Sequence, residues 1–206
     1  VERLISAATP LLVPQEDNSD GSDEDDTSED TENSPIQRAV SLRDVAMLEL
    51  FYSCGLRVTE LVTLPLSALH FDEGFLRIRG KGSKVRIVPL GSNAELLLKK
   101  YISESRPLFN KKDDGIHVFL NRKGTLISRV TAWRLIKKYS AMAGISAEVS
   151  PHWLRHSFAT HLMSHGAPIR VIQEMLGHSD IGTTQIYTHI DTKRLQNIHN
   201  QFHPRA

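Results

Sequence analysis

A tyrosine and a histidine near the carboxyl end of the chain have the types and spacing that phosphoryl transfer could use. Tyr187 lies in Thr-Thr-Gln-Ile-Tyr-Thr-His (183–189), nine residues after His178 of Leu-Gly-His-Ser. A tyrosine hydroxyl can attack phosphorus if its proton is removed and the oxyanion is stabilised. Each residue also has an ordinary structural explanation, because many tyrosines pack half-buried and a histidine can cap a helix. The pair therefore indicates a nucleophile only if phosphate ligands accompany it.

Two arginines and a second histidine are suited to binding that phosphate. His152 and Arg155 are three residues apart in Ser-Pro-His-Trp-Leu-Arg-His (150–156), so on a helix they project from one face. A guanidinium is a planar fork for two phosphate oxygens, and an imidazole can exchange a proton near neutral pH. Arg57 follows Gly55 at an expected helix start, from which it could reach a phosphate. The alternative for Arg57 is a salt bridge with a nearby acid.

A lysine in a glycine-rich turn is a candidate acid for the same reaction. Lys81 stands in Gly-Lys-Gly-Ser-Lys (80–84), between two segments that alternate apolar and basic residues. It could enter a DNA groove or protonate a leaving oxygen, whereas alone it is a solvated turn. The turn lacks the spacing and context of a nucleotide-binding loop. His152 and His156 have no evident third ligand, so the sequence predicts neither a metal nor a cofactor.

The charge of the chain is segregated. Residues 16–32 hold ten acids and no Lys or Arg, whereas from Arg38 onward 24 Lys and Arg stand against 13 Asp and Glu, a difference of +11. The net positive charge of this part of the chain favours a polyanionic partner such as nucleic acid. Proteins that bind no nucleic acid can also have such basic surfaces. The candidate DNA contacts are Arg77, Arg79, Lys84, Arg86, Arg129, Arg134, Lys137 and Lys138. The last four alternatively form a solvated helix face.

Periodicity and capping residues predict an α+β fold that is mainly α-helical, with one small antiparallel sheet. Helices are expected over 41–55 and 57–64, from a Ser92–Glu95 capping box to 105, over 128–143, 150–166, 168–177 and 191–201, and through Tyr187. The segments 75–79 and 84–88 alternate like the strands of a hairpin. Leu195, Ile198 and Phe202 form an apolar stripe on the last helix, which could pack on its own domain.

The first 35 residues differ from the rest of the chain. Residues 1–13 predict an amphipathic helical segment, 14–35 a disordered acidic loop and 36–206 the main domain. The loop is either a solvated insertion or a DNA mimic that covers the basic surface. No apolar run approaches the ~20 residues of a membrane-spanning helix. The single cysteine, Cys54, is expected to be a buried apolar residue, and the lack of a disulfide pair favours the cytoplasm.

Together and in this order, the motifs resemble the tyrosine recombinase/integrase family, in particular its bacterial Xer branch. The resemblance runs from about Arg43 to the carboxyl end and includes His-Pro-Arg-Ala at 203–206. It implies the fold of a tyrosine recombinase catalytic domain, with the helical N-terminal DNA-binding domain of the family expected to be absent here. It also implies roles for six residues: Tyr187 as nucleophile, Arg57 and Arg155 as ligands of the non-bridging phosphate oxygens, Lys81 as general acid, His152 in proton transfer and His178 in a hydrogen bond to the phosphate.

The function that the resemblance implies is site-specific DNA recombination through a 3′-phosphotyrosyl intermediate, in chromosome dimer resolution at cell division. The implied partners are a double-stranded DNA recombination site, a second Xer-type recombinase in a heterotetramer whose neighbouring subunit receives the last helix, and a septal DNA translocase. No cofactor and no membrane are expected. A phage or transposon integrase and a type IB topoisomerase share the chemistry. A DNA-binding module without activity would not need Tyr187.

Overall fold

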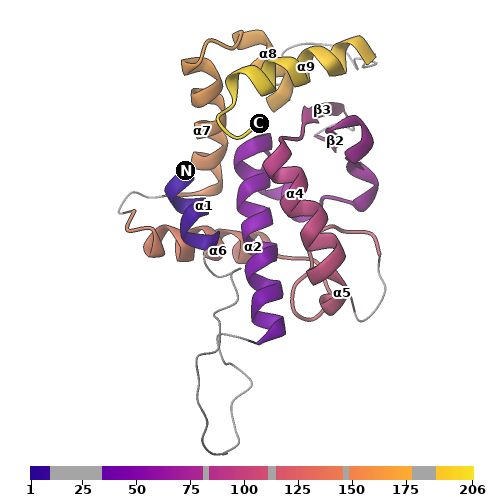
Figure 1. The fold of residues 1–206 in the computed structure, drawn as a ribbon, viewed down its shortest axis with the longest axis vertical. Coiled ribbons are helices and arrows are strands. Elements are labelled where there is room, and N and C mark those ends of the chain that lie inside the picture. The colour runs from indigo at the N-terminus through magenta and orange to yellow at the C-terminus, as the bar shows by residue number, and fades with distance from the viewer. Residues whose placement is uncertain (10–33, 81–83, 111–114, 146–148, 178–188) are drawn as a thin grey trace, which may run out of the picture.

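The described part of the chain is mostly helical and carries one antiparallel sheet (Figure 1). The computed structural model describes residues 1–9, 34–80, 84–110, 115–145, 149–177 and 189–206. The α-helices and β-strands of the described residues are α1 Glu2–Ala8, α2 Pro35–Cys54, α3 Val58–Val62, β1 Leu69–His70, β2 Phe75–Arg79, β3 Val85–Pro89, α4 Ser92–Lys100, α5 Arg106–Phe109, α6 Arg129–Met142, α7 Pro151–Ser164, α8 Ile169–Leu176 and α9 His189–Phe202. The predicted fold class, mainly α-helical α+β, is confirmed.

Helix α2 forms the centre of the fold and is buried along most of its length. Its residues from Ala39 to Cys54 are all buried, because α1, α4 and α7 surround it (Figure 1). The helix begins at Pro35 rather than at the predicted position 41. Ser34 caps it by accepting a hydrogen bond from the backbone N–H of Gln37 at 3.1 Å. Pro35, which the predicted acidic loop included, therefore belongs to the helix, while positions 14–33 lie outside the described residues.

The predicted capping box at the start of α4 is wrong. The N-cap is Gly91, whose carbonyl accepts the N–H of Glu95 at 2.9 Å, and Ser92 is already inside the helix. The Ser92 hydroxyl instead donates to the carbonyl of Ala206 at 2.9 Å, and the Glu95 carboxylate pairs with Lys99. The α-helix ends at Lys100, before the expected end at 105, and a π-helical turn over Tyr101–Ser105 leads into α5. The wide turn precedes Pro107, which has no N–H for a regular helix bond.

Replacing Ser34 by alanine is expected to lower the free energy of unfolding by about 1 kcal/mol, because the orphan N–H groups of α2 lose their cap. Urea denaturation measures the change. Ser92→Ala is the matched control, since its hydroxyl caps no helix and its loss is expected to cost under about 0.5 kcal/mol. Equal losses in the two variants would contradict the assignment of Ser34 as the cap.

The sheet has the predicted hairpin and one short strand that the sequence did not predict. Strand β2 pairs antiparallel with β3 in a register that sets Leu76 opposite Val88 and Ile78 opposite Arg86. The added strand, β1, pairs with β2 on its other edge and has only two residues, too few for periodicity to reveal it. The hairpin tip, 81–83, lies outside the described residues.

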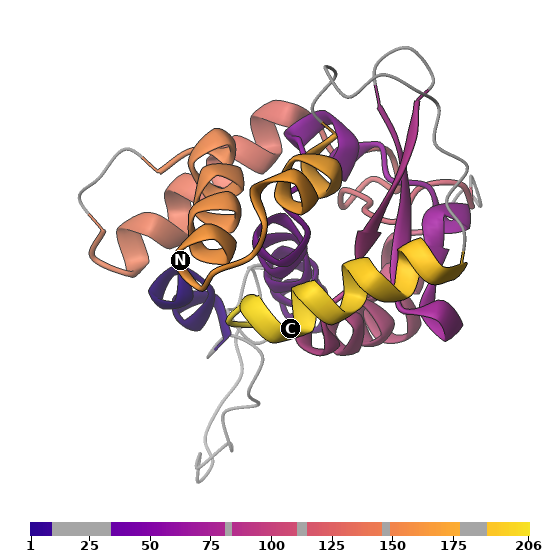
Figure 2. The same cartoon turned by 90° about the horizontal axis from the view of Figure 1, so that it is seen from above.

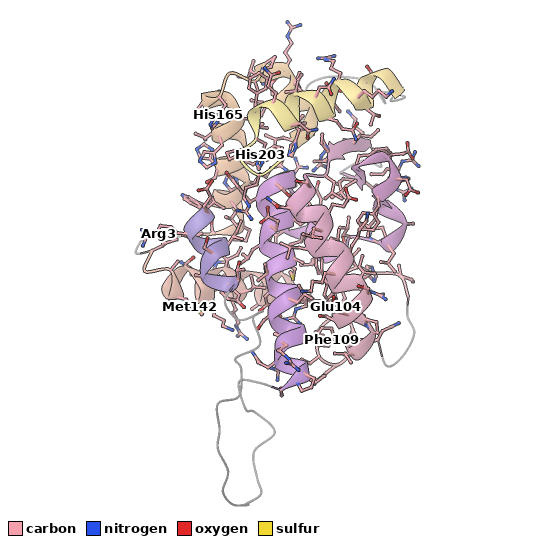
Figure 3. All side chains as sticks on the ribbon, in the orientation of Figure 1. Arg3, Glu104, Phe109, Met142, His165 and His203 are labelled. Carbon is pink, nitrogen blue, oxygen red and sulfur yellow. The ribbon has the colours of Figure 1, made fainter. Side chains whose placement is uncertain are left out.

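The last helix packs against its own domain. Figure 2 shows α9 lying across the strands and beside α7 and α8. Leu195 is 1% exposed, and Ile198 and Phe202 pack against the same apolar cluster. His203, just after α9, contacts the top of α2 through a tilted ring contact with Tyr52, at 4.8 Å between the ring centroids (Figure 3). The expected packing of the apolar stripe on its own domain is therefore present.

The expectation for the single cysteine is confirmed. Cys54 is fully buried at the end of α2, and burial raises the pKa of its thiol to about 12, which is unsuited to a nucleophile. The amphipathic segment at the start of the chain buries Leu4, Ile5 and Ala8 through α1. Within the described ranges, no helix combines the length and apolar character needed to cross a membrane.

Candidate active site

Arg57 begins helix α3 and is tied to an acid of that helix. Gly55 ends α2 with φ +54, which turns the chain so that Arg57 becomes the N-cap of α3. The backbone N–H of Arg57 donates to Oε2 of Glu60 at 2.7 Å, and its Nη1 lies 3.0 Å from Oε1. Its Nη2 donates to the carbonyl of Gly177 at 3.4 Å. The salt bridge considered from the sequence is present, yet 43% of the Arg57 side chain is exposed and retains donors for a further ligand.

Arg155 connects the turn after α2, helix α7 and the end of α8. Its Nη1 donates to the carbonyl of Gly55 and its Nη2 to that of Leu176, both at 2.5 Å. Burial, together with the charges of Arg57 and Arg86, lowers the pKa of Arg155 to about 10. The guanidinium remains charged at neutral pH, but its charge is poorly compensated. A bound anion would relieve this cost.

Arg86 is buried, so its prediction as a DNA contact is wrong. It is 5% exposed, and its Nη1 and Nη2 lie 2.7 and 2.8 Å from the two carboxylate oxygens of Glu60. Its Nε donates to the carbonyl of Met175 at 2.8 Å. The alternating pattern had assigned Arg86 to a solvent face. Helices α8 and α9 pack against β3, and Arg86 and the three residues after it are buried.

Glu60 is the acid that these arginines share, and sequence reasoning did not select it. Burial alone would raise its pKa, but hydrogen bonds and charge from Arg86 and Arg57 outweigh burial and hold the pKa of Glu60 below its usual value. Glu60 is therefore ionised at neutral pH. Its position three residues after Arg57, one turn along the same helix, was the signal that could have identified it.

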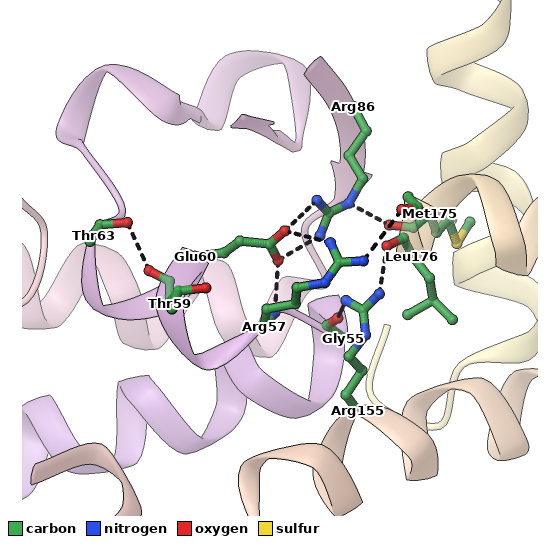
Figure 4. Close-up of polar contacts among 10 residues, drawn as sticks. Gly55, Arg57, Thr59, Glu60, Thr63, Arg86, Arg155, Met175 and Leu176 are labelled. Atoms are coloured by element: carbon green, nitrogen blue, oxygen red, sulfur yellow. Dashed lines mark hydrogen bonds and ion pairs between the residues drawn. The ribbon is translucent and has the colours of Figure 1, made fainter. Parts of the chain in front are cut away.

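We call Arg57, Arg86, Arg155 and Glu60 the arginine cluster (Figure 4). Its three guanidinium groups converge on the last carbonyls of α8, at positions 175–177, where the helix dipole favours cations. Three positive charges meet one carboxylate, which leaves an excess of two within the cluster. Two of the arginines, Arg57 and Arg155, are not fully buried, so a phosphate diester could meet both.

Only one of the other four predicted site residues lies in the part of the chain that the structure describes. His152 is exposed on α7, one turn before Arg155, as its spacing predicted. Lys81, His178 and Tyr187 lie outside the described residues. Gly177, whose carbonyl Arg57 binds, immediately precedes His178 in the chain. Within the described ranges, no group of three or more His, Cys, Asp or Glu side chains is placed to hold a metal ion.

The three described tyrosines are unsuited to be nucleophiles. Tyr52, Tyr101 and Tyr139 are each 0% exposed, and their hydroxyls bond to His161, the N–H of Leu120 and a buried carboxylate. Burial raises the pKa of Tyr52 and of Tyr101 to about 12 and also raises that of Tyr139. The sequence has four tyrosines, so Tyr187 is the remaining candidate.

Most of the other predicted DNA contacts have exposed side chains. Strand β2 and the residue before β3 present Arg77, Arg79 and Lys84, and α6 presents Arg129, Arg134 and Lys138. Lys137 is half-buried, with its Nζ 5.3 Å from the ring centroid of Trp133. These positions fit either a DNA surface or a solvated face, as the sequence left open.

Comparison with known proteins shows the family of the chain. The model of the phage integrase family matches residues 27–194. Tyrosine recombinase XerD of Proteus mirabilis is 53% identical over 173 residues, which are 83% of this chain and 55% of that protein. XerD of Vibrio cholerae serotype O1 is 45% identical over 204 residues, 98% of this chain and 66% of the relative. The chain thus spans between about half and two thirds of these relatives.

Solved structures give the same result. The crystal structure of XerA recombinase matches with a TM-score of 0.64 and 28% identity, covering 100% of this chain and 63% of that one. XerH bound to its difH substrate before cleavage matches with a TM-score of 0.66 and 28% identity, covering 95% and 50%. The sequence motifs favour the XerD type over the XerC type, and the relatives confirm this preference. The chain belongs to the phage integrase family of tyrosine recombinases, and its similarity is to XerD.

Proposed function

We propose that the chain is the catalytic part of a site-specific DNA recombinase that cleaves and rejoins DNA through a covalent bond to Tyr187. The observation that carries the proposal is the arginine cluster, whose three guanidinium groups share the single carboxylate of Glu60, so that positive charge is in excess beside the partly accessible Arg57 and Arg155. A DNA phosphate supplies the missing anion. Cations that are held in place before the reaction stabilise most strongly the negative charge that develops in the transition state, as on the oxygens of a pentavalent phosphorus.

In the proposed cleavage step, the Tyr187 oxygen attacks the scissile phosphorus while Arg57 and Arg155 hold its non-bridging oxygens. The bond from phosphorus to the 5′ oxygen breaks as the bond to the tyrosine oxygen forms. Lys81 gives a proton to the departing 5′ oxygen. His152 serves in proton transfer by accepting the proton that the Tyr187 hydroxyl releases, and His178 donates a hydrogen bond to the phosphate.

Rejoining reverses these steps with the 5′ hydroxyl of a partner strand. Because the phosphotyrosyl ester keeps the energy of the broken phosphodiester, the exchange needs no ATP. Guanidinium groups take the part that Mg²⁺ plays in other phosphoryl-transfer enzymes. The exposed lysine and arginine side chains of the hairpin and of α6 bind the DNA backbone. The affinity of the protein for DNA therefore falls steeply as the salt concentration rises.

The proposed setting is chromosome dimer resolution at cell division, in the cytoplasm. The DNA is a double-stranded recombination site, the partner is a second Xer-type recombinase in a heterotetramer, and a septal DNA translocase controls the reaction. The XerD relatives at 45–53% identity favour this setting over that of a phage or transposon integrase. XerH in complex with difH is a similar chain bound to a recombination site.

Incubation with a nicked suicide DNA substrate in EDTA tests the proposal. We expect a protein–DNA adduct that survives denaturing electrophoresis and disappears in Tyr187→Phe, with DNA binding retained. Tyr101→Phe is the matched control and should still form the adduct, because Tyr101 is fully buried. An adduct that persists in Tyr187→Phe, or none from the unsubstituted chain on DNA that it binds, would contradict the proposal. The second outcome would favour a binding module.

A further inference from the structure

A buried arginine of the cluster has no part in the reaction as described above. Arg86 lies on β3 and is 5% exposed, and all three nitrogen atoms of its guanidinium group donate hydrogen bonds to other residues of the protein. It is therefore closed to DNA, although its neighbours in the cluster are not. We propose that Arg86 is a positioning residue for strand cleavage, which holds Glu60 and the end of α8 and thereby places Arg57 against the scissile phosphate. This inference rests on the proposed function.

The contacts of Glu60 define the first half of this role. Both of its carboxylate oxygens accept from Arg86, at 2.7 and 2.8 Å. The same two oxygens accept from the side chain and the backbone of Arg57, at 3.0 and 2.7 Å. Because Arg86 fixes the carboxylate in two places, the carboxylate can hold Arg57 in one orientation. Without Arg86, Glu60 would be free to turn, and Arg57 would turn with it.

The second half of the role concerns the end of α8. Arg86 donates through Nε to the carbonyl of Met175, next to the carbonyls that Arg155 and Arg57 bind. A Cβ on Gly177 would lie 2.8 Å from Cδ of Arg86, so the helix end rests directly on the arginine stem. Gly177 also has φ +65, which ends α8 and turns the chain toward position 178. Arg86 therefore contacts both helix α3, which carries Arg57, and the end of α8, to which Arg57 and Arg155 donate.

Only an arginine can make this set of contacts. A lysine ammonium is a compact charge on a flexible stem and cannot bind two carboxylate oxygens in a fork while also donating to a carbonyl on the opposite side. Arg86→Lys keeps the buried positive charge beside Glu60 but removes the paired hydrogen bonds to the carboxylate and the hydrogen bond to the carbonyl of Met175. The variant should therefore fold while losing the orientation of Arg57.

A matched control exists elsewhere in the domain. Arg106 is 7% exposed and donates through Nε and Nη2 to the carbonyl of His117, at 3.1 and 2.8 Å. It belongs to α5, at the end of the molecule away from α8 and α9 (Figure 1). Arg106→Lys thus makes the same chemical change at a buried arginine that has no link to the cluster.

The test is the single-turnover rate of adduct formation at saturating protein. We expect Arg86→Lys to cleave on the order of 10- to 100-fold more slowly than the unsubstituted chain, which is less than the effect of removing a transition-state ligand because Arg57 is displaced rather than lost. Its Kd for DNA should change by less than about twofold, because the side chain does not reach the DNA. Arg106→Lys should keep both the rate and the Kd, and thermal unfolding checks that both variants fold.

A substrate with a methylphosphonate at the scissile position separates positioning from a general structural defect. The methyl group replaces a non-bridging oxygen and leaves the diester neutral. The cleavage rate on this substrate therefore depends less on the positive charge of Arg57. The deficit of Arg86→Lys should shrink severalfold on this DNA. An unchanged cleavage rate in Arg86→Lys, or an equal loss of rate on both substrates, would overturn the positioning role of Arg86 but leave the proposed function standing. Absence of any adduct from the unsubstituted chain would overturn the proposed function and this inference with it.

Discussion

Replacing Arg155 by lysine is expected to slow strand cleavage by about a hundred- to a thousandfold, the usual effect of losing a preorganised donor to a developing oxyanion. Two of the Arg155 nitrogens hold the carbonyls of Gly55 and Leu176, so the guanidinium is fixed before DNA arrives. Its depressed pKa reflects burial and two neighbouring cations, a cost that phosphate binding relieves. Lysine keeps the charge but cannot hold both carbonyls and a phosphate oxygen at once.

The measurement is again single-turnover cleavage of the suicide substrate, with thermal unfolding as a check on folding. Arg122→Lys is the control, since Arg122 is exposed and donates to the side chain of Gln37 at the start of α2. It should retain the rate within about twofold. A rate in Arg155→Lys equal to that of the unsubstituted chain would exclude Arg155 from binding the transferred phosphate.

Acidification from pH 7.5 to 5 is expected to lower the free energy of unfolding by at least about 2 kcal/mol through the histidines that hold α9. Burial lowers the pKa of His203 to about 3, and the nearby His199 and His161 charges act in the same direction. Burial also lowers the pKa of His199, whose Nε2 lies 2.8 Å from the carbonyl of Ser53. Arg205 and Glu49, paired at 2.8 Å, and Tyr52 are further charged or titratable neighbours.

The sign follows from the lowered pKa values. His203 is neutral in the folded chain at pH 5 and takes up a proton on unfolding, and the lowered pKa of His199 acts in the same direction. Their contribution is present above pH 6.5 and is lost as the pH falls toward the folded value. Urea denaturation at several pH values measures the slope. His203→Phe should flatten it because the ring is kept and the titration is removed. The exposed His156, changed to Gln, should leave it unaltered; a steep slope in His203→Phe would contradict the account.

Local signals predicted most of the elements correctly. Ser150 before Pro151 marked the start of α7, and glycines at 144, 166 and 177 marked helix ends because they adopt positive φ. The same Ser-Pro signal at Ser34 was overlooked, since it lies at the edge of an acidic stretch that composition had assigned to disorder. Ser92 and Glu95 had the right spacing for a capping box, but the helix starts one residue earlier, at a glycine cap.

The candidate site was predictable only where residue type and position along one element decide the outcome. Arg57 at a helix start and Arg155 on one face of α7 were identified in this way, and the structure brings both to the end of α8. Arg86 was misassigned because strand alternation supposes one solvent face. Whether that face is covered depends on α8, which follows about 80 residues later in the sequence. Such long-range packing leaves no local pattern in a strand.

The covalent bond to Tyr187 is the central claim, and the most direct test is to map the adduct itself. The protein–DNA adduct formed in EDTA would be digested with trypsin and nuclease, and the modified peptide identified by mass spectrometry. We expect the nucleotide on the peptide that contains Tyr187, joined through a 3′ phosphate, with a free 5′ hydroxyl on the released strand. A nucleotide on any other residue, or a linkage through a 5′ phosphate, would contradict the mechanism.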